Sequence, residues 1–197
     1  MPEKIITIAC MLLGLTSWSS AQNALNFDDT NDFVQTTSPG VLGSANRTFE
    51  AWVFVSSSAP SSNLAILDYG LNAVGSRNTF SISGSRQVIF ISGGTNANIS
   101  TTANAVPVNL WTHVAFVLDN GTGYLYINGI QKGTGSLTTV NTPSNNQNII
   151  VGQRVSGGSI PFEESIDEVS SDSSRNTDRY EYGTLQSRSK LTIISKI

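Results

Sequence analysis

Cysteine is almost missing from this sequence, and histidine is equally rare. The 197 residues include one cysteine, Cys10, and one histidine, His113. A single thiol cannot form a disulfide within the chain, so the fold has to rely on core packing or on metal ions. A catalytic histidine needs partners, yet no second histidine and no serine or cysteine nucleophile motif accompanies His113.

Charged side chains are also scarce. They make up 13% of the residues, with 14 acidic and 11 basic side chains and a net charge of -3. No basic run occurs before the C-terminal tail, and nucleic-acid binding needs clustered lysine and arginine. Nucleic acid is therefore not expected as a partner. Ser, Thr, Asn and Gly take the place of charge, which suits one domain of short strands and many turns.

Long hydrophobic runs are missing apart from one near the N-terminus. Lys4 precedes an apolar run, residues 5–15, that is too short for a transmembrane helix. Small residues follow, and Ser19 and Ala21 fit the small-x-small pattern of a cleavage site. Residues 1–21 are therefore predicted to be a secretory signal peptide, which implies a secreted or cell-surface protein.

No stretch of the remaining chain has helical periodicity. Short runs rich in β-branched and aromatic residues alternate instead with turn signals such as Asn120-Gly121 and Asn128-Gly129. This spacing is typical of an all-β antiparallel sandwich or barrel. Strands are expected at residues 23–27, 32–36, 47–55, 64–70, 78–83, 86–92, 97–103, 111–119, 123–129, 148–154 and 164–169.

The period of two assigns faces within these strands. In residues 48–55, one face carries only apolar side chains, from Phe49 to Val55, while the other carries Glu50, Trp52 and Phe54. In residues 111–119, Val114, Phe116 and Leu118 oppose Trp111, His113, Ala115 and Val117. Because both faces are partly apolar, these strands are expected to lie in the middle of a sheet with both sides covered.

Five segments in order carry a family resemblance: "ALNFDDTNDFVQ", "RTFEAWVFV", "WTHVAFVLDNGTGYLYINGIQKGTG", "IIVGQR" and "FEESIDEV". Together they resemble the laminin-G-like (LamG) jelly-roll domain of the concanavalin A-like lectin/glucanase superfamily, over roughly residues 23–169. The resemblance implies two antiparallel sheets packed face to face, with the domain at residues 22–169. It also suggests that Trp111 and Leu125 are core residues.

For function, the resemblance implies a secreted, non-catalytic recognition or adhesion module. Its ligand would be a carbohydrate or a protein at a cell surface or in extracellular matrix. Two alternatives stay open: a glycoside hydrolase of the same superfamily, and a structural domain truncated from a larger adhesin. No binding residue is assigned, although Phe33, Tyr69, Tyr124 and Tyr126 are rings that could stack on a sugar.

No catalytic residue is assigned either, and enzymatic activity stays open. His113 is interpreted as a half-buried structural residue whose ring bonds to Glu50 on another strand. The glucanases use carboxylates on one face of a strand. Here the alternation would place Glu164, Ile166 and Glu168 on one face and Asp167 on the other, so the central acid is missing.

Calcium is the one cofactor that the resemblance suggests. The segment "FDDTND" offers oxygen ligands of the kind that Ca²⁺ prefers. Relatives often hold a structural calcium ion between the first strand and an aspartate of the last. By that resemblance, Asp28 and Asp167 would be the side-chain ligands. The alternative is that these carboxylates only cap turns.

Residues 170–197 depart from the family pattern. They are dense in Arg and Ser, poor in Gly, and show no helical face. Two interpretations stay open, a disordered or partly extended tail and the product of a reading-frame error. In the second case the sandwich would lack part of its closing strand, which would expose an edge to aggregation.

Overall fold

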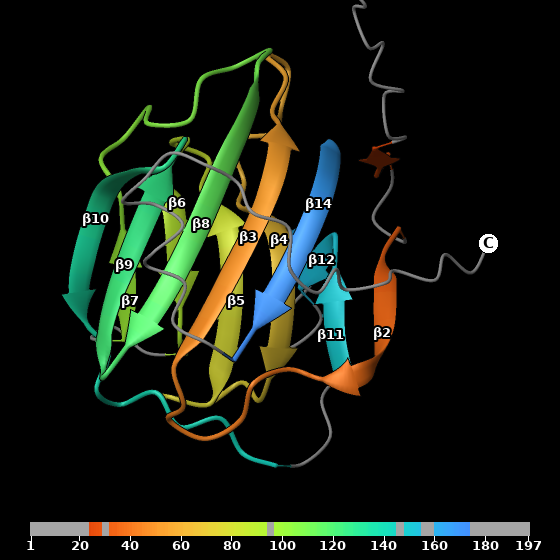
Figure 1. Cartoon of the computed structure of the whole chain (residues 1–197). Coiled ribbons are helices and arrows are strands. Elements are labelled where there is room, and N and C mark those ends of the chain that lie inside the picture. The colour runs from red at the N-terminus through yellow and green to blue at the C-terminus, as the bar shows by residue number, and fades with distance from the viewer. Residues whose placement is uncertain (1–23, 29–31, 94–96, 145–147, 155–159, 174–197) are drawn as a thin grey trace, which may run out of the picture.

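The computed structural model describes residues 24–28, 32–93, 97–144, 148–154 and 160–173 (Figure 1). Every regular element in these ranges is a β-strand, which confirms the predicted all-β class. No helix in these ranges is long and apolar enough to cross a membrane. The predicted signal peptide and residues 174–197 lie outside the described residues.

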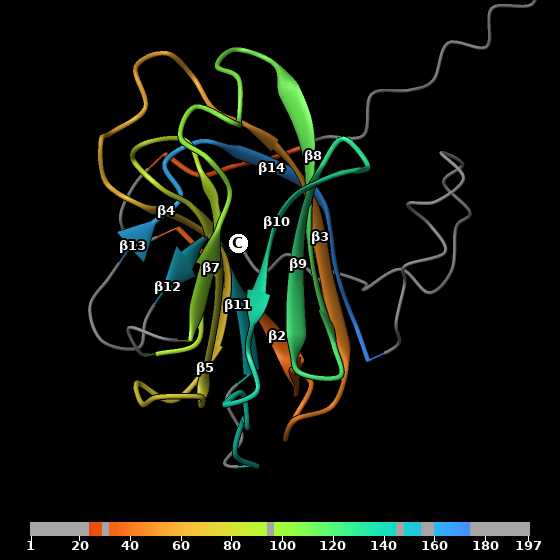
Figure 2. The same cartoon turned by 90° about the vertical axis from the view of Figure 1, so that its left-hand side faces the viewer.

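Two six-stranded antiparallel sheets form the molecule, and Figure 2 shows them edge-on as two layers. The front sheet of Figure 1 contains, in spatial order, β1 (Leu25–Asn26), β14 (Ser165–Asp172), β3 (Arg47–Phe54), β8 (Trp111–Asp119), β9 (Thr122–Ile127) and β10 (Ile130–Ser136). The strands β3 and β8 lie in its middle, as their two partly apolar faces predicted.

The back sheet follows the same antiparallel plan. It contains, in order, β2 (Val34–Pro39), β11 (Asn148–Val151), β4 (Leu64–Gly70), β5 (Arg77–Ile82), β6 (Val88–Ile91) and β7 (Asn98–Ser100). A short hairpin of β12 (Gln153–Arg154) and β13 (Ile160–Pro161) packs against β4. Figure 2 shows this hairpin on the side of the back sheet that faces away from the front sheet.

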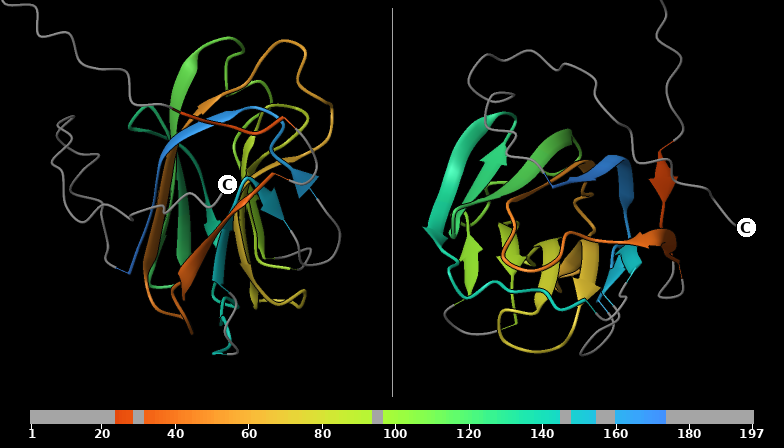
Figure 3. Two further views of the ribbon diagram at one scale, coloured as in Figure 1. Left: turned by 90° about the vertical axis from the view of Figure 1, so that its right-hand side faces the viewer. Right: turned by 60° about the horizontal axis from the view of Figure 1, so that its bottom comes forward.

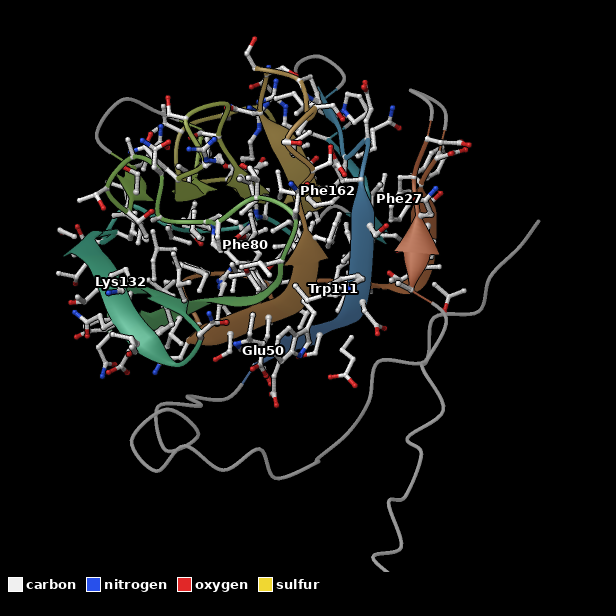
Figure 4. All side chains as sticks on the ribbon, turned by 90° about the horizontal axis from the view of Figure 1, so that it is seen from above. Phe27, Glu50, Phe80, Trp111, Lys132 and Phe162 are labelled. Carbon is white, nitrogen blue, oxygen red and sulfur yellow. The ribbon has the colours of Figure 1, made fainter. Side chains whose placement is uncertain are left out.

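The core lies between the two sheets. Phe49, Phe80, Phe90 and Phe116 are fully buried there, and the rings of Phe90 and Phe116 stack at a centroid distance of 3.8 Å. Figure 4 shows Phe80 between the layers. Each buried phenylalanine contributes about 1.5–3 kcal/mol through removal of apolar surface from water. The predicted inward faces of β3, β8 and β9 are confirmed as part of this core.

All predicted strands have a counterpart, but the edges of the sheets differ from the prediction. No strand was expected at the glycine-rich β10 or at β13. Residues 148–154 divide into β11 and β12 at Gly152, whose φ is +85°. The closing strand β14 continues to Asp172, three residues beyond Val169, and pairs with β3 up to Thr48 (Figure 3).

Candidate functional site: an aromatic sheet face

Aromatic side chains from three adjacent strands lie together on the outward face of the front sheet. On this face, β3 carries Trp52 and Phe54, and β8 carries Trp111 and His113. Next to them, Tyr126 of β9 packs against Ala115 and Val117 of β8. The period of two produces this set, because the alternate residues of the same strands form the core. We call Trp52, Phe54, Trp111, His113, Tyr124 and Tyr126 the aromatic face.

Trp111 is the most exposed ring of the aromatic face. Its exposed fraction is 43%, and its ring lies 5.8 Å from that of Phe54 at an angle of 57°. The preceding Leu110 is 60% exposed. The prediction that Trp111 belongs to the core was therefore wrong, because the strand turns this residue outward in phase with His113 and Ala115. Leu125 is fully buried, so its assignment to the core is confirmed.

The centre of the face combines rings with hydrogen-bonding groups. The Nε2 atom of His113 lies 3.5 Å from Oε2 of Glu50, and both side chains are largely buried. This confirms the expected contact between them. The His113 ring also meets the edge of Trp52 at 5.4 Å, and the Ser170 hydroxyl donates to Oε1 of Glu50. Figure 4 shows Glu50 on the outer side of the front sheet. These contacts fix the rings in place.

The other proposed sugar-stacking rings are divided by the structure. Tyr69 is fully buried in the core, where its hydroxyl donates to the Val41 carbonyl at 3.1 Å. Tyr124 and Tyr126 belong to the aromatic face, and Phe33 lies apart, 46% exposed, just before β2. The alternation of the sequence placed Trp52 and Phe54 on one face of their strand, and the register of β3 with β8 brings Trp111 to the same face. Which of them reach solvent depends on neighbouring strands.

The carboxylates near the closing strand do not form a one-face set. The alternation breaks at a bulge between Asp167 and Ser170, where Glu168 adopts a φ of +49°. Ile166 and Val169 are therefore both turned into the core, and the prediction that Glu168 shares a face with Ile166 was wrong. Glu164 instead accepts a hydrogen bond of 2.6 Å from the Ser56 hydroxyl.

The two aspartates of the calcium prediction lie at different points of one strand pair. The register pairs Leu25 with Ile166, so Asp167 stands opposite residue 24, whereas Asp28 lies two residues beyond the end of β1. Two oxygens on one calcium ion lie within about 5 Å of each other. The register therefore favours a site at Asp28 alone, and ligation by either aspartate stays a prediction. Asp28 lies instead next to Asp32, whose carboxylate accepts its backbone N–H.

No group of three or more acidic, histidine or cysteine side chains in the described ranges could hold a metal ion. Of the acidic segment that suggested calcium, residues 29–31 lie outside those ranges. Calcium binding near Asp28 therefore stays a prediction. The aromatic face, by contrast, offers ring planes and fixed polar groups, which suits a ligand with both apolar and hydroxyl surfaces.

Comparison with solved structures identifies the same sandwich in other proteins. A protein of Bacteroides ovatus with a provisional description as carbohydrate-binding matches with a TM-score of 0.62 and 21% identity, over 81% of this chain and 46% of that one. The CBM40 module of the Ruminococcus gnavus IT-sialidase, bound to α2,3-sialyllactose, matches with a TM-score of 0.62 and 13% identity, over 83% and 97%.

Domains LG4-5 of the mouse laminin α1 chain match with a TM-score of 0.58 and 13% identity, over 76% of this chain and 42% of that one. The chain thus spans less than half the length of the Bacteroides and laminin structures. No curated protein sequence matches it.

The sequence itself matches a laminin G family model over residues 28–172, which is most of the chain. The match begins in the segment after β1 and ends with β14, so it covers both sheets. These limits agree with the resemblance seen in the sequence. The chain belongs to the concanavalin A-like lectin/glucanases superfamily.

Proposed function

We propose that this protein is a secreted, non-catalytic module that binds carbohydrate through the aromatic face of its front sheet. The observation that carries the proposal is the exposed Trp111 ring, which Phe54 supports from the neighbouring strand. One side of a pyranose ring consists largely of C–H groups, which pack on aromatic planes. The fold adds support, because similar sandwiches include a module bound to a sialylated oligosaccharide.

The exposure of Trp111 also favours ligand binding for an energetic reason. A large ring in water at the surface forgoes part of the stabilisation that burial would provide. The Trp111 ring lies against that of Phe54, so the two rings offer adjacent apolar surface, and contiguous apolar surface of this kind marks interaction sites. The rigid sheet below means that little conformational entropy is lost when a ligand covers these rings.

The glycoside hydrolase alternative has weaker support. Hydrolysis needs two carboxyl groups that face one substrate across a short gap. On the described part of the aromatic face, Glu50 is buried against His113 and Ser170, which favours a positioning role. The third alternative, a structural adhesin domain, would leave the exposed Trp111 ring without a ligand.

The test uses the chain without residues 1–21, because these are the predicted signal peptide. A printed array of defined oligosaccharides finds the ligands, and isothermal titration calorimetry measures the best of them. We expect Trp111→Ala to weaken binding at least tenfold. Phe33→Ala, which removes another exposed ring away from the aromatic face, is the matched control. Array binding that Trp111→Ala leaves unchanged, or no array binding at all, would contradict the proposal.

A further inference from the structure

The turn between β5 and β6 contains an arginine in a backbone conformation that usually belongs to glycine. The Arg86 N–H donates to the Ser83 carbonyl at 2.7 Å, and the Ser83 N–H donates to the Gln87 carbonyl at 2.8 Å, which closes a hairpin with a three-residue loop. The last residue of such a loop is left-handed and is normally glycine. Arg86 has a φ of +55°, so its side chain is placed there at an energetic cost. Backbone strain of this kind points to a function of the side chain.

Arg86 lines a small pocket at the end of the sandwich where β3 ends and β8 begins, at the top of Figure 1. The pocket lies between the β3–β4 connection, the β5–β6 turn and the segment before β8. Its walls include Ser56, Ser57, Pro60, Ser83, Arg86 and Val108. Its volume of about 60 Å³ is room for a few water molecules or for one edge of a sugar ring. We call it the rim pocket.

The guanidinium of Arg86 keeps hydrogen-bond donors for a ligand. Within the described ranges it forms one side-chain hydrogen bond, to Oδ1 of Asn104, and it makes no ion pair with a carboxylate there. Asn104 also has a positive φ, +59°, which Asn tolerates better than most residues. A guanidinium carries several N–H donors in a planar fork. One of them holds the side chain in place through Asn104, and others remain for a ligand in the rim pocket.

Ser56 adds a hydrogen-bond acceptor to the same pocket. Its hydroxyl donates to Oε1 of Glu164 at 2.6 Å and lies 2.9 Å from the Ser58 hydroxyl. Because the Ser56 proton is used in the bond to Glu164, the Ser56 oxygen can only accept from a ligand. The Glu164 carboxylate behind Ser56 also disfavours an anion in the pocket. Arg86 and Ser56 thus offer a donor and an acceptor, which suits sugar hydroxyls because each hydroxyl can accept and donate.

The rim pocket adjoins the aromatic face along two neighbouring strands. Phe54 belongs to the aromatic face, and Ser56 of the pocket follows it by two residues, at most about 7 Å along the chain. On the adjacent strand, Val108 of the pocket precedes Trp111 by three residues. Asn109 lies between these two and bonds to the segment after β3 through its N–H at 2.7 Å and its side chain at 3.0 Å. A ligand that stacks on Trp111 can therefore extend into the rim pocket.

We propose that the rim pocket is a second sugar subsite, which binds the hydroxyl groups of a neutral sugar residue beyond the one that stacks on Trp111. Arg86 donates to these hydroxyls and Ser56 accepts from them. This inference rests on the proposed carbohydrate-binding function and adds to it, because the protein then recognises an oligosaccharide rather than a single sugar. It also explains why an arginine occupies a turn position that glycine would fill without strain.

The experiment is calorimetric titration of the chain without residues 1–21. The probes are the neutral oligosaccharide that binds best on the array and its two homologues that lack the sugar residue at one end or the other. We expect one homologue to bind the unaltered chain at least tenfold more weakly than the full oligosaccharide. Arg86→Gly should bind the full oligosaccharide as weakly as that homologue and no longer distinguish the two. Its midpoint of thermal unfolding should not fall, because glycine removes the strain.

Three further variants separate the explanations. Arg86→Asn also tolerates a positive φ, so it should give the same binding result if glycine loosens the turn. Asn120→Gly is the matched control, since it replaces another residue of positive φ at the opposite end of β8 and should keep both affinities. Trp111→Ala should weaken binding of both probes and keep their ratio.

The outcomes distinguish this inference from the proposed function. An unchanged preference for the full oligosaccharide in Arg86→Gly and Arg86→Asn would overturn the second subsite and leave the aromatic face as the binding site. An equal loss in Asn120→Gly would overturn it too. If only sugars with a carboxylate or sulfate group lost binding in Arg86→Gly, the pocket would take an anion and the proposal of a neutral sugar would be wrong. No array binding at all would overturn both proposals.

Discussion

The residue that does most to join the two sheets is Arg47. It is fully buried at the start of β3, and its guanidinium donates to Asn78, Thr142 and Tyr69 side chains and to carbonyls of the loop before it. These acceptors come from β5, from β4 and from the segment after β10. A buried guanidinium is tolerated only when its donors are satisfied in this way.

Tyr69, which bonds to Arg47, should make the folded state less stable at alkaline pH. Burial raises the pKa of its hydroxyl to about 12, against the lowering effect of Arg47. In the unfolded chain the Tyr69 hydroxyl loses its proton near pH 10. The contribution of Tyr69 to the stability of the folded state is therefore complete below pH 10 and is lost as the pH rises to 12. We predict a loss of about 2–3 kcal/mol from this group over that range.

Urea unfolding between pH 9 and pH 12 measures this loss. Tyr69→Phe should start lower at pH 9, since it lacks the hydroxyl bonds to Val41 and Arg47, but should then fall less steeply with pH. Parallel slopes for the two proteins would show that Tyr69 is not the group responsible.

Single residues also show where sequence reasoning reaches its limit. The contact of His113 with Glu50 could be expected, because the two face the same way on adjacent strands. Whether Trp111 is buried or exposed could not be predicted, because the burial of a residue at the end of a strand depends on the side chains of neighbouring strands and loops. The sequence also did not show that Tyr69 is unavailable to a ligand, which follows from the burial of its strand β4 along its whole length.

At the scale of elements, the period of two predicted the central strands well. Hydrophobic alternation is clear there, because one face of each strand packs in the core while the other face is turned outward. The edge strand β10 lacks it: its residues are mostly exposed and two of them are glycine. The bulge in β14 could not be predicted either, since it shifts the alternation by one residue at Glu168, which is not a glycine.

The break between β11 and β12 depends on Gly152. Its φ of +85° is accessible mainly to glycine, and an added Cβ would lie 2.3 Å from the ring of Phe27. We predict that Gly152→Ala destabilises the fold by about 1–2 kcal/mol from the backbone and by about 1–3 kcal/mol more from the clash. Chemical denaturation measures the difference in free energy of unfolding.

Gly129→Ala is the matched control for this prediction. Gly129 also has a positive φ, +78°, but no atom lies within 4 Å of its added Cβ. Gly129→Ala should therefore lower the free energy of unfolding only by the backbone contribution, about 1–2 kcal/mol. Equal losses in the two variants would mean that Phe27 moves away freely and does not hold β1 against the back sheet.

At the scale of the whole molecule, the closing of the sandwich depends on chain segments far apart in sequence. Among the strands that the structure describes, β1 pairs only with β14, and β14 joins it to β3. The Phe27 N–H donates to the Glu164 carbonyl, and the Phe27 ring lies over Gly152. The resemblance implied two antiparallel sheets packed face to face, and this is confirmed. The register of β1 with β14, which separates Asp28 from Asp167, could not be obtained from sequence.

That register sharpens the calcium prediction, which thermal unfolding of residues 22–197 with calcium or with a chelator can test. Calcium that binds only the folded chain raises the midpoint. Because the register sets Asp167 opposite residue 24 rather than opposite Asp28, we predict that Asp28→Asn abolishes the calcium-dependent rise while Asp167→Asn keeps it. Loss of the rise in both variants would mean that the two carboxylates share one ion and that the register differs in solution. A midpoint that does not respond to calcium would contradict calcium binding by this chain.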